Sequence, residues 1–79
     1  MTMLRVIYSE DLRIARIASE IYSRLRDNSL NPFSVKLNFF PGTGEAEVVY
    51  YFQDSDKLPE KSKLVDILKG INFKLLNLQ

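Results

Sequence analysis

The sequence predicts an α+β fold in the order β-α-β-β-α, with three antiparallel strands and two helices on one face of the sheet. Three observations predict it. Two segments with alternating apolar residues flank a Pro-Gly turn, a segment before them has apolar residues at helical spacing, and another such segment follows them. With 79 residues the chain forms one domain, residues 1–79, because it is too short for two cores.

A short strand and an amphipathic helix are predicted first. Residues 3–8 form the strand, and Ser9 fits the N-cap position of the helix, with two acidic residues after it at the positive end of the helix dipole. Pro32 prevents the helix from continuing. Its apolar residues follow the spacing i, i+3, i+4, i+7, i+8 and i+11, at Ile14, Ile17, Ala18, Ile21, Tyr22 and Leu25.

A β-hairpin is predicted next, around the turn at residues 41–44. In the register that this turn sets, Phe40 faces Glu45. The register also places three apolar pairs on the core face, Phe39 with Ala46, Leu37 with Val48 and Val35 with Tyr50. A shift by one residue would place apolar side chains against polar ones along the whole hairpin, so the register is well specified.

A long helix is expected to end the chain. Pro59 suits its first turn, where a missing N–H is harmless. Gly70 would lie in the middle of this helix and would destabilise it by roughly 1 kcal/mol relative to alanine. The expected core stripe of the helix is Leu64, Ile67, Leu68, Ile71, Leu75 and Leu78.

The second strand of the hairpin has apolar side chains on both faces. Val49 and Tyr51 point away from the expected core, and Phe40 is their neighbour on the preceding strand. An antiparallel sheet normally has one face in water. We therefore predict that Phe40, Val49 and Tyr51 form a dimer interface, through which the sheet is extended by a second copy of the chain or by a paralogue.

Composition excludes several functional classes. The chain has no cysteine and no histidine, which removes disulfides, thiolate zinc sites and the commonest general base. Carboxylates of the hairpin and of residues 54–56 are typical of a solvated edge and of helix caps. We expect no catalytic residue, metal or cofactor, no membrane segment and a cytoplasmic setting; the natural start is either Met1 or Met3.

Four arginines lie on or near the polar side of the first helix: Arg13, Arg16, Arg24 and Arg26. Glu20 lies four residues from Arg16 and four from Arg24, so one interpretation is a solvated face stabilised by its own ion pairs. The other interpretation is a contact surface for RNA phosphates, which match the fork of an arginine side chain. The sequence leaves both interpretations open.

Several short motifs together resemble the small Pcc-type subunit of the KEOPS complex, over about residues 4–78. They are Ser9-Glu10-Asp11, Ala15-Arg16 and Leu25 around the first helix, Asn31-Pro32 before the hairpin, and Asp54 and Leu58 before the last helix. The family usually has a Leu-Arg pair at the start of the last helix. Here Leu58 is followed by Pro59-Glu60, with Lys61 or Lys63 as substitutes for the arginine.

The resemblance implies a non-catalytic role in the complex that makes the threonylcarbamoyl modification on adenosine 37 of tRNA. In that family the subunit dimerises through its sheet, docks the larger catalytic subunit on its helical side and helps to hold tRNA. Helix residues expected to meet the larger subunit are Ile14, Ile21, Ile71 and Phe73.

Two other functions are compatible with the sequence. One is an autonomous RNA-binding module that uses the four arginines. The other is a small ligand-binding or catalytic domain of ferredoxin-like type, which only the fold favours.

Overall fold

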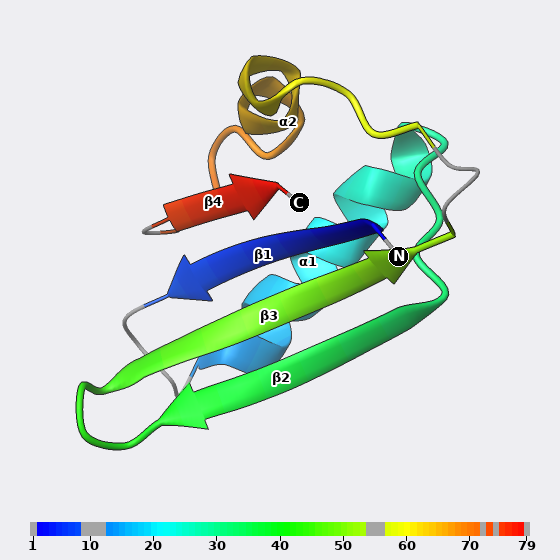
Figure 1. Ribbon diagram of the computed structural model, residues 1–79. Coiled ribbons are helices and arrows are strands. Elements are labelled where there is room, and N and C mark those ends of the chain that lie inside the picture. Colours follow the sequence, from blue (N-terminus) through cyan, green and yellow to red (C-terminus); the bar gives the residue numbers. More distant parts are fainter. Residues whose placement is uncertain (1, 9–12, 54–56, 72, 74, 79) are drawn as a thin grey trace.

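The computed structural model describes residues 2–8, 13–53, 57–71, 73 and 75–78. Within these residues the chain forms four strands and two helices. Their order along the chain is β1 (Thr2–Tyr8), α1 (Ile14–Asp27), β2 (Ser34–Phe40), β3 (Glu45–Phe52), α2 (Lys61–Ile67) and β4 (Leu75–Leu78). Figure 1 shows a sheet with α1 behind it and α2 next to its β4 edge. The expected α+β class and the order β-α-β-β-α are confirmed.

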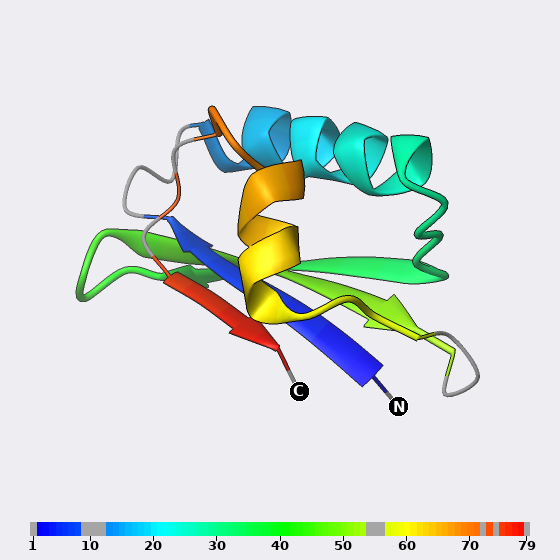
Figure 2. The same cartoon turned by 90° about the horizontal axis from the view of Figure 1, so that it is seen from above.

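The strands form one antiparallel sheet in the order β2-β3-β1-β4. The predicted hairpin register is confirmed, since Phe40 pairs with Glu45, Leu37 with Val48 and Val35 with Tyr50. Figure 2 shows both helices on the same side of the sheet, so the other face has no helix over it. We call these two faces the helix side and the open side.

The expected long C-terminal helix is wrong beyond Ile67. Gly70 has a φ of 90°, a left-handed conformation that glycine adopts without strain and that ends the turns after α2. The chain then returns as β4, which pairs with β1 and satisfies backbone groups along the second edge of that strand. Thus Leu75 and Leu78, expected in the helix stripe, belong to a fourth strand.

Helix α1 has the predicted buried stripe of Ile14, Ile17, Ala18, Ile21 and Leu25. The helix lies over β3, to which it is joined by a hydrogen bond of 2.6 Å from the hydroxyl of Tyr50 to the carbonyl oxygen of Ala18. Burial raises the pKa of the Tyr50 phenol. The helix ends at Asp27, and Ser29 then adopts a left-handed conformation that lets the N–H of Leu30 donate to the carbonyl of Leu25. The predicted N-cap at Ser9 lies outside the described residues.

The core is formed by α1, α2 and the helix side of β1 and β3. Leu4 and Val6 of β1 are fully buried, as are Val48 and Phe52 of β3. The helix side of β2 is different. Its residues Val35, Leu37 and Phe39 are 42%, 39% and 54% exposed, so the expectation that they belong to the core is wrong. Their register is as predicted, but α1 does not extend over the edge strand.

The Tyr50 hydrogen bond leads to a stability prediction. Tyr50→Phe should lower the free energy of unfolding by about 1–3 kcal/mol, because the Ala18 carbonyl loses its buried partner. Urea unfolding measures this difference, and Tyr51→Phe, at a half-buried position on the open side, is the matched control. The folded state disfavours the Tyr50 phenolate, so stability should fall as pH rises above the ordinary tyrosine pKa of about 10. That decline should be smaller in Tyr50→Phe; identical pH curves would contradict the assignment.

Candidate protein-interaction site

The exposed apolar residues of the structure gather on β2. Large hydrophobic side chains that are at least 39% exposed are Phe33, Val35, Leu37, Phe39, Phe40 and Val65, and all but Val65 lie on β2 or directly before it. We call Val35, Leu37 and Phe39 the β2 row. Within the described part of the chain, β2 pairs only with β3, so its second edge leaves backbone N–H and C=O groups unpaired.

This edge has few of the features that usually prevent an edge strand from pairing. The strand has seven residues, contains no proline, and carries a single charge, Lys36. The turn after it is closed by two hydrogen bonds, from the N–H groups of Thr43 and Gly44 to the carbonyl of Phe40. Strand β2 is therefore a long apolar edge, held in place on one side by β3 and open on the other.

The predicted dimer-interface residues are not equally accessible. Phe40 is 41% exposed and Tyr51 is half-buried, whereas Val49 is only 2% exposed. Val49 is the central residue of the open side, with Arg5 and Lys36 as its paired neighbours, and long side chains around it cover it. The expectation that Val49 is a free surface residue is wrong.

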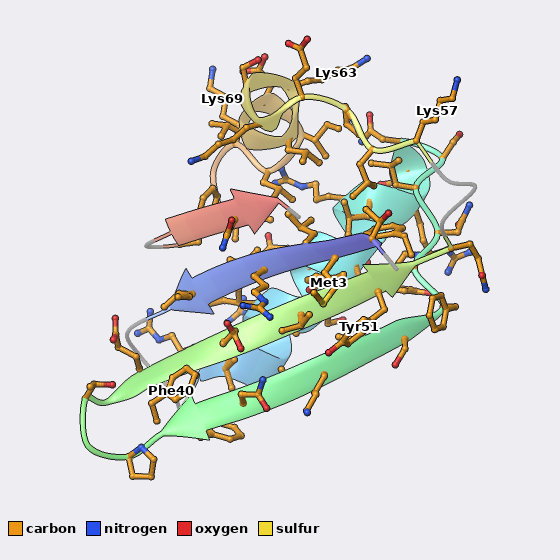
Figure 3. All side chains as sticks on the ribbon, viewed as in Figure 1. Met3, Phe40, Tyr51, Lys57, Lys63 and Lys69 are labelled. Carbon is orange, nitrogen blue, oxygen red and sulfur yellow. The ribbon has the colours of Figure 1, made fainter. Side chains whose placement is uncertain are left out.

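The open side as a whole is poorly suited to packing against a second sheet. Figure 3 shows Met3 beside Tyr51, with which it is paired, and Phe40 at the other end of this face, with polar side chains between the two ends. The Nε of Arg5 is already buried and has no hydrogen-bond partner among the described residues. A second sheet stacked here would bury the Arg5 charge, and an unpaired buried charge is strongly unfavourable.

The helix residues predicted to contact a larger partner belong mostly to the core of the chain. Ile14, Ile21 and Ile71 are 2%, 0% and 8% exposed, so they are not available to another protein and this expectation is wrong. Phe73 is half-buried and packs against the core. The helical spacing that identified these residues indicates burial, but it does not tell whether the burial is within one chain or between two.

The four arginines of α1 also differ in their surroundings. Arg13 and Arg16 are exposed, and the guanidinium of Arg26 lies over the ring of Tyr22, 5.9 Å from its centre. Arg24 has a structural role, because its Nη1 donates hydrogen bonds to the carbonyl oxygens of Ile67 (3.0 Å) and Lys69 (2.8 Å). A cation at the C-terminal end of α2 interacts favourably with the free carbonyls there.

A pocket of about 470 Å³ lies between the end of α1 and the segment before α2. Its lining includes Ser29, Leu58 and Ile67, together with Lys57 on the segment near the end of α1 and Lys63 on α2, as Figure 3 shows. Two ammonium groups would attract an anion. Among the described residues no group of three or more acidic side chains could hold a metal ion.

The search for related proteins yields no relative. Comparison of the chain with protein-family models, with curated protein sequences and with solved structures finds no match. Within the described ranges, no helix has both the length and the apolar character needed to cross a bilayer.

The Arg24 contacts lead to the second prediction. Arg24→Ala should destabilise the segment from α2 to Ile71, because two carbonyls at the end of a seven-residue helix lose a charged donor. We expect faster amide hydrogen exchange at residues 64–71 and a loss of about 1–2 kcal/mol in unfolding free energy. The control is Arg16→Ala on the exposed side of the same helix, which should change stability by less than about 0.5 kcal/mol. Equal effects of the two substitutions would show that the Arg24 contacts do not hold α2.

Proposed function

We propose that this chain is a non-catalytic scaffold subunit that dimerises by pairing its β2 edge with β2 of a second copy. The observation that supports this most directly is the exposed β2 row beside an open strand edge. An exposed, long and apolar edge strand is the surface on which another strand pairs most readily. The dimer would have a continuous eight-stranded sheet with all helices on one side.

The sequence of β2 is complementary to itself in the antiparallel direction. When the two-fold axis lies midway between Leu37 and its own copy, these two residues are opposite each other. Val35 then lies opposite Phe39 of the second strand. On the open side, Lys36 lies opposite Asn38, and the Nδ2 of Asn38 donates to Oε1 of Glu47 at 3.0 Å. The lysine of each copy is thereby placed near a carboxylate of the other.

The free energy of the backbone hydrogen bonds, compared with the cost of association, indicates that the β2 row is necessary for this pairing. A seven-residue antiparallel pair forms about six backbone hydrogen bonds, each with a net contribution of about 1 kcal/mol. Association costs about 4–15 kcal/mol in lost translational and rotational freedom. Backbone pairing alone would give a weak dimer, so contacts along the β2 row have to supply the remainder.

The resemblance to the Pcc-type subunit extends the proposal to a biological setting. We propose that the dimer serves a cytoplasmic KEOPS complex, supporting threonylcarbamoyl modification of adenosine 37 in tRNA by bridging catalytic subunits and helping to hold tRNA. The order of the first five elements, β-α-β-β-α, supports this setting, whereas the short α2 and the strand β4 depart from the long C-terminal helix of that family. The basic residues of the helices and their flanks also support the setting, since residues 13–27 and 57–69 together have eight basic and four acidic side chains.

The second candidate function is an autonomous RNA-binding module. The exposed Arg13 and Arg16 favour it. It is weakened by Arg24, which is engaged with the end of α2, and by Arg26, which lies over the Tyr22 ring. Arg24 and Arg26 thus have contacts within the chain, and the scaffold explains more of the exposed surface.

The proposed dimer is tested by Leu37→Lys. In the paired strands two lysines would then face each other, so we expect a monomer, measured by light scattering at micromolar concentration. The matched control is Val65→Lys on α2, which is 43% exposed compared with 39% for Leu37 and lies away from β2. This variant should remain a dimer. A wild-type chain that is monomeric at 100 μM (about a hundredfold above a micromolar Kd) would contradict the proposal.

The biological setting is tested separately. The tagged chain, purified from the organism that encodes it, should bring down a tRNA-modifying catalytic subunit in near-equal amount. Leu37→Lys should retain that partner while losing the second copy of itself. Recovery of RNA without any protein partner, with an affinity that falls steeply with salt, would instead favour the RNA-binding module.

A further inference from the structure

The helix layer of the proposed dimer has a gap at its centre, over the two β2 strands. This inference rests on the proposed dimer. In the single chain, α1 lies over β3, and α2 lies toward the β4 side of the sheet, as Figure 1 shows. The β2 row is therefore uncovered on its helix side. Pairing two β2 strands edge to edge places the two rows next to each other without covering either of them.

The dimensions of this gap correspond to one helix. Neighbouring strands lie about 4.8 Å apart, so two β2 strands provide a floor about 10 Å wide. Where α1 lies over β3, near Ala18, the two α1 axes would be about 14 Å apart across the two-fold axis. Figure 1 shows that α1 crosses the sheet obliquely, so its first turn lies nearer β2 and its last turn lies farther from it. Packed helices have axes 8–10 Å apart, so the α1 helices cannot touch, whereas one helix between them could contact both.

Each wall of the gap is a stripe of residues on α1, and the side chains at the N-terminal end of this stripe are small. Arg24 points to α2. Ala15 comes nine residues earlier, which is two and a half helical turns, so it lies on the opposite side of α1 and points toward β2. Ser19, Tyr22 and Arg26 follow Ala15 at the spacing i+4, i+7 and i+11 and continue the same stripe. Ala15 and Ser19 have small side chains, which permit a neighbouring helix to approach closely.

Length and charge define the occupant further. The β2 row spans about 13 Å along its strand, and the α1 stripe spans about 16 Å, so a helix of about 11 residues would cover both. The charged residue of the α1 stripe is Arg26, which is exposed and occurs once on each wall of the groove, whereas Arg24 points to α2 and the lysines of residues 57–69 lie toward β4. A helix with acidic flanks complements this charge.

We propose that the groove formed by the two β2 rows and the two α1 stripes binds one amphipathic helix of another protein, with an apolar face and acidic flanks. Because the groove lies on the two-fold axis, it holds one helix for every two chains. The bound helix contacts both copies of α1 and the floor formed by both copies of β2. It completes a layer of five helices over eight strands.

The experiment uses a fluorescent 15-residue model peptide with leucines at helical spacing i, i+3, i+4, i+7 and i+11 and glutamates on both flanks. Its controls are a scrambled peptide and a version with lysines in place of the glutamates. Titration of the full chain is followed by fluorescence anisotropy, and light scattering reports the oligomeric state in the same samples. The acidic peptide should saturate at one peptide per two chains, and both controls should bind at least tenfold more weakly.

Ala15→Arg provides the structural test, since it places a large side chain in the part of the α1 stripe that has small residues, without touching the β2 edge. We expect it to weaken peptide binding at least tenfold and to leave the dimer intact. Ser23→Arg adds the same charge on the exposed side of α1 and should change binding less than twofold. A dimer that does not bind the acidic peptide, or binds it equally in both variants or no more tightly than its controls, overturns the helix groove and leaves the proposed dimer standing. A monomeric chain overturns both.

Discussion

The helix side of the sheet is wider than the helices that cover it, and the rest of the structure depends on this difference. Four strands are held together by β1 and β3, each paired on both edges, and the core is built over these two strands. Helix α2 has only seven residues and lies toward β4. Helix α1 is fixed over β3 by the Tyr50 hydrogen bond, and Arg24 ties it to the end of α2. Both helices are thereby drawn away from β2, whose apolar row stays in water.

Local features of the fold could be predicted from the sequence because neighbouring residues determine them. The hairpin register follows from matching apolar positions across a short turn. The buried residues of α1, from Ile14 to Leu25, follow from helical spacing. The fourth strand could not be predicted in this way. Residues 75–78 are apolar nearly throughout, which suits a buried helix or a strand equally, and the choice depends on an open edge of β1 about 70 residues earlier. Gly70 was the local signal, since its left-handed conformation ends the helical turns.

The candidate site shows the same division between local and long-range information. Alternation assigned Val35, Leu37 and Phe39 correctly to the helix side, but their exposure depends on where α1 lies, which no pattern within β2 reveals. The opposite error occurred at Val49, which was assigned correctly to the open side and yet is covered by its neighbours on three strands. Periodicity gives the direction of a side chain. It does not give the amount of protein above it.

The proposed dimer and the proposed helix groove depend on each other energetically. Backbone pairing of two β2 strands offsets only part of the cost of association, and the exposed row remains a source of further stabilisation. A helix that contacts both α1 copies binds the dimer and not the monomer, so it stabilises the dimer by mass action in proportion to its own affinity. A partner helix would therefore bring two copies together as well as dock on them. In this arrangement a small chain without histidine or cysteine acts as a scaffold through its unpaired edge and its uncovered row.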